Sequence, residues 1–441
     1  MKRLLPLLLC AVLALFCATT AQAAGVSITL TASEYALHYA FDAGAQDPFV
    51  ILEYATPAEK GWMMLYSADG HFEGDVSLAY SGAGGKTSVA LTSARTTGSI
   101  GKASTTLPKA ADYQKPTGKS NAKVMDFVLT ETPEGFHYAF NAIGTDYMLL
   151  YWRSKEQTVT QPVYPDENGH YEGDVVSELT FARTQFTVQV KSGSGSMKKE
   201  ATVRKGYQAP EAPQRQEGRL SGVTVCIDAG HQENGRFVNE PIGPGLTGST
   251  SGKGGMAQGT KTNRRESIVC LEIGMLLRDE LLRQGANVIM TREDQTTFHT
   301  NIERCEIAEA GGAQIMLRLH CNNSSNRSKR GIQVYGPLNS DYAKAVADAD
   351  TYREMGQKLL EAMKTRVGMT LANSTGMVRL NDNYVGNNWA KMMCFLVEMG
   401  YLSNPAEEYL LVTPVYQQWL AEGMADGVYE IAVARGWVQA Q

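Results

Sequence analysis

Two histidines and two glutamates in the C-terminal half of the chain have the chemistry of a metal-dependent hydrolytic site. His231 and His320 each follow an apolar run typical of a buried strand, and Glu398 follows a third such run. Glu266 begins an amphipathic pattern that predicts a helix ending near Gly285. Two imidazoles and one carboxylate with an open position are the ligands of catalytic zinc, and a further carboxylate can accept a proton from activated water.

Strands that alternate with helices must bring these four side chains together. From Leu220 onward this alternation predicts an α/β layer with a largely parallel sheet, and such sheets bind ligands beyond the carboxyl ends of their strands. The spacing alone is a weak signal, because it contains no compact HExxH pair. Histidine is scarce, however, since this domain holds only His231, His299 and His320. The expected strands are 223–227, 286–291, 314–319 and 392–397, and the expected helices are 266–285, 301–310 and 342–365.

The length and composition indicate several globular domains. At about 150 residues per domain, the 441 residues correspond to about three domains. Hydrophobic residues make up 43% of the chain and charged residues 20%, which are ordinary globular proportions. A net charge of -5 argues against a nucleic-acid partner.

Residues 1–23 have the pattern of a secretory signal peptide. Lys2 and Arg3 precede an apolar run from 4 to 16, and Ala21 and Ala23 form a small-residue cleavage site. This run is shorter than the roughly 20 residues that span a bilayer. No later stretch is apolar enough, so we expect no transmembrane segment in the mature chain.

Five cysteines would remain after cleavage of the signal peptide. Their apolar surroundings indicate small buried hydrophobic residues without a disulfide framework. The neighbouring pair His320 and Cys321 leaves a thiolate ligand or nucleophile as the alternative. The five are Cys226, Cys270, Cys305, Cys321 and Cys394.

The first half of the mature chain contains one unit used twice. Segment 26–43 is similar to 125–142, and GHFEGDV at 70–76 is similar to GHYEGDV at 169–175, both at an offset of 99 residues. Short alternating runs between Gly, Asn, Asp and Pro clusters predict Ig-like or fibronectin-like sandwiches. The Gly-His element is interpreted as a turn into a strand, or as a ligand-binding loop. Packed core or turn positions, rather than metal ligation, are the preferred interpretation for the shared histidines His38, His71, His137 and His170.

A proline-containing, charged segment separates the repeats from the C-terminal half. It has no apolar periodicity and is therefore interpreted as a linker. The predicted organisation is a signal peptide at 1–23, β-sandwich repeats at 24–115 and 121–207, a linker at 208–219 and a catalytic domain at 220–437.

The motifs of the C-terminal half together resemble the zinc-dependent N-acetylmuramoyl-L-alanine amidases. They are VCIDAGH at 225–231, Glu266 at a helix start, Thr291-Arg292 after a strand, LHCN at 319–322 and VEMGYLSNPAEE at 397–408. This resemblance covers about residues 220–437 and implies a twisted, mostly parallel sheet with helices on both faces. The expected fold class is therefore α/β in the C-terminal half, preceded by two tandem all-β repeats.

The resemblance also implies the roles of the site residues. His231, Glu266 and His320 would ligate one Zn²⁺ ion per catalytic domain, and Glu398 would be the general base. The bond cleaved would join N-acetylmuramic acid to the L-alanine of the peptidoglycan stem peptide. The alternatives are a non-catalytic cell-wall-binding or regulatory protein on the same fold, and a zinc carboxypeptidase. We expect a secreted protein of the cell wall or periplasm that binds peptidoglycan, with other wall polymers or a protein as ligands of the β-repeats.

Further motif residues are expected to support this site. Asp228 and Asn322 would hold the ligands in place, and Arg292 would form a structural ion pair. Residues 232–263 are rich in glycine and are interpreted as a mobile flap or substrate-binding loop. The polar segment 381–389 is expected to line the substrate groove.

Overall fold

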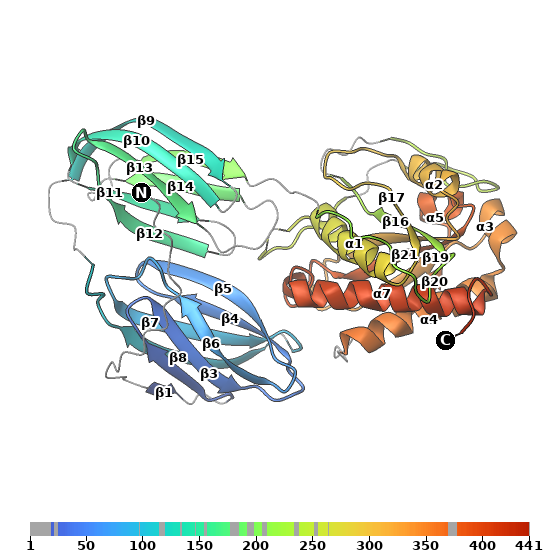
Figure 1. Ribbon diagram of the computed structural model, residues 1–441, viewed down its shortest axis with the longest axis horizontal. Coiled ribbons are helices and arrows are strands. Elements are labelled where there is room, and N and C mark those ends of the chain that lie inside the picture. Colours follow the sequence, from blue (N-terminus) through green and yellow to red (C-terminus); the bar gives the residue numbers. More distant parts are fainter. Residues whose placement is uncertain are drawn as a thin grey trace. The chain divides into compact units, whose positions relative to one another are not determined.

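The computed structural model divides into two compact units, one built on the all-β repeats and the other on the C-terminal α/β domain (Figure 1). The predicted signal peptide lies outside the described residues except for Thr19–Ala21, which forms strand β1. The structure describes residues 19–21, 25–96, 98–113, 120–132, 135–145, 147–153, 157–176, 185–191, 198–204, 210–232, 238–250, 255–262, 264–368 and 377–440.

Each repeat contributes strands to two antiparallel sheets. One sheet belongs to a single repeat, with the order β1-β2-β3-β6 in repeat 1 and β13-β10-β9 in repeat 2. The strands of these two sheets are β2 (Ile28–Ala32), β3 (Ala36–Asp42), β6 (His71–Ser77), β9 (Ser120–Thr132), β10 (Gly135–Thr145) and β13 (His170–Val176).

The second sheet is shared by both repeats. Its eight strands have the order β15-β14-β11-β12-β5-β4-β7-β8, and β12 pairs with β5 across the two repeats. The sequence predicts two separate modules, whereas the structure joins them through this sheet. The strands are β4 (Phe49–Ala55), β5 (Glu59–Tyr66), β7 (Gly85–Ser93), β8 (Ser99–Leu107), β11 (Met148–Arg153), β12 (Gln157–Val163), β14 (Gln185–Lys191) and β15 (Lys198–Arg204).

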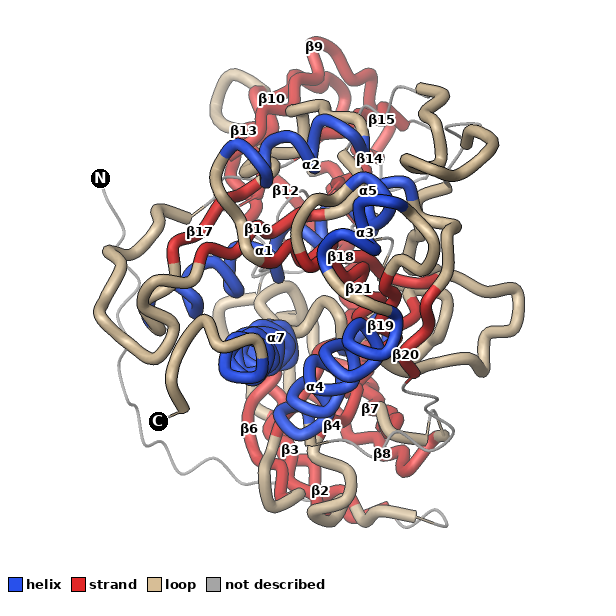
Figure 2. The backbone as a smooth tube through the Cα atoms, turned by 90° about the vertical axis from the view of Figure 1, so that its right-hand side faces the viewer, coloured by secondary structure: helices blue, strands red, loops and turns tan. Residues whose placement is uncertain are grey.

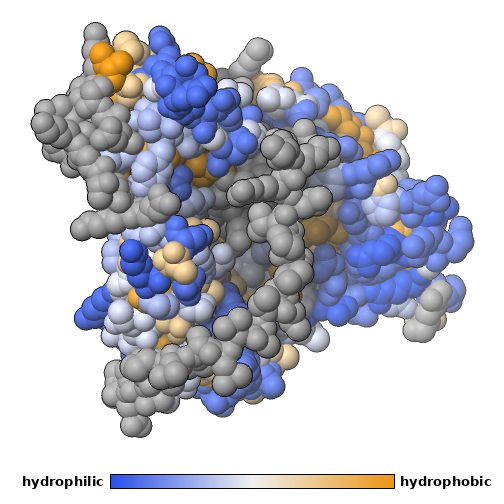
Figure 3. Space-filling model, turned by 60° about the vertical axis from the view of Figure 1, so that its left-hand side comes forward, coloured by the Kyte–Doolittle hydropathy of each residue, from blue (hydrophilic) through white to orange (hydrophobic). Residues whose placement is uncertain are grey.

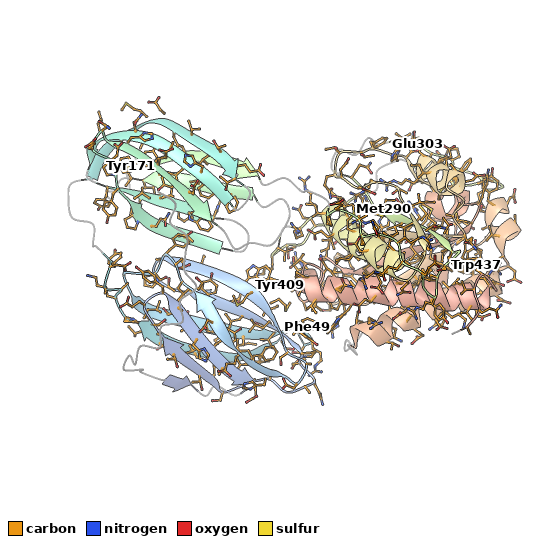
Figure 4. The ribbon with its side chains drawn as sticks, in the orientation of Figure 1. Phe49, Tyr171, Met290, Glu303, Tyr409 and Trp437 are labelled. Atoms are coloured by element: carbon orange, nitrogen blue, oxygen red, sulfur yellow. The ribbon has the colours of Figure 1, made fainter. Side chains whose placement is uncertain are left out.

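Alternation along the strands separates a buried face from an exposed face in each repeat. Phe41 stacks on Phe72 with ring centroids 4.9 Å apart, and the equivalent rings of Phe140 and Tyr171 are 4.6 Å apart. Tyr171 is fully buried between the strands of repeat 2 (Figure 4). The all-β architecture is thus confirmed, and the likeness to immunoglobulin or fibronectin modules stays a prediction.

The shared histidines lie on the exposed face, so their interpretation as packed core residues is wrong. The interpretation of the Gly-His element as a turn into a strand is confirmed, because Gly70 and Gly169 have φ values of 80° and 78° and His71 and His170 begin β6 and β13. The side chains of His38 and His71 are 38% and 51% exposed. They stand on β3 and at the start of β6, opposite Asp75 and Asp42. In the view of Figure 3 the described surface is largely hydrophilic, with hydrophobic residues scattered among polar ones, as is usual for a folded protein.

The C-terminal unit is built on a six-stranded mixed sheet with the order β17-β16-β18-β21-β19-β20. The first four strands in this order are parallel, and β19 runs antiparallel to β21. The sequence did not predict β19 or β20, which have four residues each. The strands are β16 (Thr224–Ala229), β17 (Asn287–Met290), β18 (Ile315–Asn322), β19 (Gln333–Gly336), β20 (Met377–Leu380) and β21 (Met393–Tyr401).

Helices cover both faces of this sheet. In Figure 2, α4 and α7 lie on one side of the strands and α2, α3 and α5 on the other. The single helix expected at 342–365 is broken, because Asp348 accepts a hydrogen bond from the N–H of Thr351 and begins a new helix. The helices are α1 (Glu266–Arg283), α2 (Asn301–Ala310), α3 (Asp341–Val346), α4 (Ala349–Val367), α5 (Val385–Trp389), α6 (Glu407–Leu410) and α7 (Pro414–Ala434).

Two further features of the described residues concern apolar helices and cysteines. No helix among these residues combines the length and apolar character needed to cross a membrane. All five cysteines of the C-terminal half are free and buried, which confirms their prediction as small core residues.

Candidate metal and catalytic site

Glu266 occupies the centre of the site, between two histidines. Its Oε1 atom lies 3.0 Å from Nε2 of His231 and 3.0 Å from Nδ1 of His320. One ligand atom from each of the three residues lies within 4.8 Å of the others. Across the described segments, this is the only group of three or more His, Cys, Asp or Glu side chains that could hold a metal ion.

Backbone amides fix the Glu266 carboxylate at the start of α1. Its Oε2 atom accepts a hydrogen bond from the N–H of Ala257 at 2.8 Å, and its Oε1 atom accepts one from the N–H of Cys321 at 3.0 Å. Burial alone would raise the pKa of Glu266, but hydrogen bonds with His231 and His320 hold it well below its usual range. The side chain is therefore an ionised, fixed carboxylate.

His231 lies in a tight turn directly after β16. Its φ of 59° is in the left-handed region, which residues other than glycine rarely adopt. Gly230 is required before it, because a Cβ atom there would lie 2.4 Å from the carbonyl oxygen of Leu319 and 2.6 Å from Cε1 of His320. The N–H of Gly230 also donates to the carbonyl of Leu319 at 2.9 Å. The turn therefore packs directly against β18, which carries the second histidine.

His320 and Glu398 are register partners on the parallel strands β18 and β21. Burial lowers the pKa of His320, which favours the neutral imidazole that binds metals. Burial, and then the negative charge of Glu266, raise the pKa of Glu398 well above its usual value. All four predicted site residues line one cavity.

Asp228 contacts no ligand side chain in the described structure and instead anchors two arginines. Its Oδ1 atom accepts hydrogen bonds from Arg304 and from Thr291, and its Oδ2 atom accepts one from Nε of Arg318 at 2.9 Å. Burial would raise the pKa of Asp228, but the two guanidinium groups hold it well below its usual range. Arg304 also donates to the carbonyl of His231 at 3.2 Å. The predicted support of a ligand by Asp228 is therefore indirect.

Arg292 does not form the predicted ion pair among the described contacts. Its guanidinium donates to the backbone carbonyls of Ala229, Gly230, Ser267 and Asp294 at 2.7–2.9 Å. Burial, and then the positive charge of Arg304, lower the pKa of Arg292 to about 10. Arg292 thus binds backbone dipoles rather than a carboxylate.

The residues that follow His320 contribute less than the sequence suggested. The side chain of Asn322 donates to Oε1 of Gln333 at 3.1 Å, so its bond leads away from the ligands. Cys321 is buried, and burial raises the pKa of its thiol well above the usual value. This protonated thiol is poorly suited to be a ligand or nucleophile. The contribution of Cys321 to the site is its backbone N–H, which donates to Oε1 of Glu266 at 3.0 Å.

A cavity of about 990 Å³ lies over the four site residues. Val238 and Met256 of the glycine-rich loop line it, which supports the substrate-loop interpretation, and Tyr384 confirms that the segment 381–389 contributes to its wall. Residues 233–237, 251–254 and 263 of the loop lie outside the described residues. The cavity falls within the usual size range of ligand pockets.

The glycine-rich loop is fixed to the start of α2 by Glu240. Its carboxylate accepts hydrogen bonds from the N–H groups of Asn301 at 3.2 Å and Ile302 at 2.8 Å. These N–H groups belong to the first turn of a helix, where negative charge is stabilised. The loop is thereby held beside the cavity.

Sequence reasoning missed Glu240, Arg304 and Arg318. One signal was available, because Arg318 interrupts the apolar run at 314–319. An arginine in a buried strand requires a charged or hydrogen-bonding partner. The partner Asp228 lies on the neighbouring strand β16, opposite Arg318 in register.

Comparison with known proteins identifies the C-terminal half. Residues 225–430 match the family described as N-acetylmuramoyl-L-alanine amidase, and they form a domain of that type. The chain is 26% identical over 231 residues to the germination-specific N-acetylmuramoyl-L-alanine amidase of Bacillus subtilis (strain 168), covering 49% of this chain and 83% of that protein. It is also 26% identical over 218 residues to the probable cell wall amidase LytH of Staphylococcus aureus, covering 48% of this chain and 60% of that protein.

Solved amidase structures are similar over the same share of the chain. The N-acetylmuramoyl-L-alanine amidase of Clostridium difficile 630 is 23% identical, with a TM-score of 0.38, 48% of this chain covered and 96% of that chain. The apo N-acetylmuramyl-L-alanine amidase of Mycobacterium abscessus is 19% identical, with a TM-score of 0.43, 48% of this chain covered and 99% of that chain.

Proposed function

We propose that the amidase domain is a zinc enzyme that hydrolyses the amide between N-acetylmuramic acid and the L-alanine of the peptidoglycan stem peptide. His231, Glu266 and His320 hold the zinc ion, and Glu398 is the general base. The observation that carries this proposal is the convergence of three ligand atoms within 4.8 Å, together with Glu398, whose buried Oε2 atom has no hydrogen-bond partner in the described structure.

The residues present fit a zinc ion. Two imidazoles and one carboxylate form a donor set used by catalytic zinc. Nε2 of His320 and Oε2 of Glu398 are buried and have no hydrogen-bond partner in the described structure. Buried polar atoms are rarely left unpaired, so an ion, water or substrate group is expected to satisfy them.

The metal site and Glu398 have different roles in the proposed hydrolysis. A zinc ion at this site would supply Lewis acidity toward the carbonyl and lower the pKa of water. Glu398 accepts the proton of the attacking water at its unpaired Oε2 atom and then delivers it to the departing alanine amine. The buried surroundings that raise the pKa of Glu398 suit a group that must both take and give a proton.

The cavity provides space for the substrate, and the N-terminal segments determine where the reaction takes place. The cavity of about 990 Å³ has room for a stem peptide and part of a sugar. We propose that the signal peptide at 1–23 exports the chain to the cell wall or periplasm. The repeats at 24–115 and 121–207 then hold the catalytic domain at 220–437, through the linker at 208–219, near wall polymer or a partner protein.

Product analysis tests the proposed reaction. The chain without residues 1–23 is incubated with peptidoglycan, with and without a chelator, beside Glu398→Gln, and the products are analysed by mass spectrometry. We expect free stem peptides that begin with L-alanine, absent with chelator or with Glu398→Gln and restored by zinc. Cleavage only at the peptide carboxyl end would instead indicate a carboxypeptidase. Intact glycan–peptide linkages would indicate a non-catalytic wall-binding role.

A further inference from the structure

Three successive backbone carbonyls of the turn that carries His231 converge on two buried guanidinium groups. Nε of Arg292 donates to the carbonyl of Ala229 at 2.7 Å, and its Nη2 donates to that of Gly230 at 2.9 Å. Arg304 donates to the carbonyls of Ala229 at 3.0 Å and His231 at 3.2 Å. The turn therefore has a carbonyl-binding partner for each of its residues.

Arg292 also reaches the helix that carries the carboxylate ligand. Its Nη2 donates to the carbonyl of Ser267 at 2.7 Å, and Ser267 directly follows Glu266 in the first turn of α1. One planar group thus connects the turn after β16 to the start of α1. These two elements supply His231 and Glu266, whose ligand atoms lie 3.0 Å apart.

The backbone of His231 needs such support. A non-glycine residue in the left-handed region is strained unless the surrounding structure determines its conformation. Arg292 is 2% exposed, and its guanidinium donates only to backbone carbonyls among its described contacts, so none of these hydrogen bonds belongs to an ion pair.

We infer that Arg292 is a positioning residue, which sets the separation of the ligands His231 and Glu266 by binding the carbonyls of Ala229, Gly230 and Ser267. The inference rests on the proposed zinc function and goes beyond it, because it assigns metal affinity to a residue that touches neither metal nor substrate. A lysine cannot replace the planar fork, because its ammonium group is a single point that cannot reach three divergent carbonyls with the same geometry.

The test is the zinc affinity of the full chain, measured by competition with a chromogenic chelator for wild type, Arg292→Lys and Arg278→Lys. Arg278 is the matched control, since it is 4% exposed, lies on α1 and donates to the carbonyl of Pro210 at 3.0 Å. We expect Arg292→Lys to raise the Kd for zinc roughly 10–100-fold, as loss of outer ligand support does elsewhere. Arg278→Lys should leave the Kd unchanged. Circular dichroism at the assay temperature confirms that each variant is folded.

The possible outcomes separate this inference from the proposed function. Wild-type zinc affinity in a folded Arg292→Lys variant, even with a lower Tm, would overturn the inference and leave the zinc function intact. A wild-type chain that binds no zinc would refute both. If Arg292→Lys does not fold, Arg292→Gln replaces it, because its amide group cannot donate to all three carbonyls, and wild-type zinc affinity in that folded variant would also overturn the inference.

Discussion

The repeats and the amidase domain both place histidines beside carboxylates, but in opposite surroundings. On repeat 1, Nδ1 of His38 lies 3.1 Å from Asp75, a distance close to the 3.0 Å that separates His231 from Glu266. The side chains of His38 and Asp75 are 38% and 69% exposed, however, whereas those of His231 and Glu266 are 23% and 4% exposed. Separation between two partners therefore does not distinguish the sites.

What differs is how the partners are arranged. On the repeat, Glu73 lies between His38 and His71, with contacts of 3.4 and 3.6 Å, and the outer nitrogens face Asp75 and Asp42. This arrangement, here called the exposed line, follows the length of the neighbouring strands β3 and β6. In the amidase domain the ligand atoms form a compact cluster. Repeat 2 has the same line with Asn141 in place of Asp42.

The comparison teaches that backbone groups, more than residue types, create the candidate metal centre. The Glu266 carboxylate is held by two backbone N–H groups and the His231 turn by arginine–carbonyl bonds. In the exposed line, the described hydrogen-bond partners of the histidine rings are carboxylate side chains alone.

Metal content gives the largest expected difference between the two regions. His320→Ala should reduce bound zinc from about one ion per chain to none and abolish hydrolysis, because a ligand is lost. The double variant His38→Ala/His71→Ala should keep both the zinc and the hydrolysis. Metal analysis after gel filtration measures this, and loss of zinc in the double variant would show that the exposed line binds metal.

A buried carboxylate should make the amidase domain sensitive to pH. Burial raises the pKa of Glu407 to about 7, although the N–H groups of Tyr401 and Gly331 act in the opposite direction. The folded state then binds the proton more tightly than the unfolded state, whose pKa is near 4.5. The free energy of unfolding should therefore fall by about 3 kcal/mol between pH 4.5 and 7 from this group.

Denaturant unfolding of wild type and Glu407→Gln at several pH values measures this effect. The two oxygens of Glu407 accept from the N–H groups of Gly331 and Tyr401, whereas a glutamine side chain has one oxygen acceptor. Glu407→Gln should therefore be less stable than wild type at low pH. Its disadvantage should shrink as the pH rises toward 7. A difference that stays constant across this range would contradict the prediction.

A helix cap near the site should have a smaller effect. The side chain of Thr300 accepts a hydrogen bond from the N–H of Glu303 at 3.2 Å, and the carboxylate of Glu303, labelled in Figure 4, accepts one from the N–H of Thr300 at 2.7 Å. Thr300→Ala should lower the free energy of unfolding by about 1 kcal/mol. Thr300→Ser keeps the hydroxyl group, so equal losses in both variants would argue against the cap.

Changes in the exposed line should have the smallest effect on stability. A hydrogen bond with Asp42, and then the charges of Asp42 and Glu73, raise the pKa of His71. Its contribution to stability is therefore present below about pH 6.5 and is lost as the pH rises through the raised value. An NMR titration assigned with His71→Asn should give a pKa above 6.5, with only a slight change in Tm. A pKa below 6.5 would show that the Asp42 contact is not maintained in solution.

Much of the catalytic sheet could be predicted, because its parallel strands are continuous apolar runs that end in polar residues. The start of α1 at Glu266 was also predicted correctly. The strands β19 and β20 were missed, since four residues carry too little periodicity. Arg292 was misread because a sequence shows possible charge partners and not backbone carbonyls brought close by folding.

The same limit applies to the repeats. Internal similarity predicted two units, and alternation predicted strands. The pairing of β12 with β5 depends on edges that meet only after both units fold, and it involves three residue pairs, among them Thr158 with Lys60. The break before α4 was missed because the alanine-rich segment around 343–349 has high helix propensity.

Because both repeats share one eight-stranded sheet, neither repeat can be lost without exposing a strand edge of the other. Removing repeat 1 would free the outer edge of β12, and removing repeat 2 would free that of β5. A newly bare edge invites pairing between molecules. Each repeat is thus half of one continuous sheet, and a relative that lost one half would have to cover the exposed strand or lose solubility.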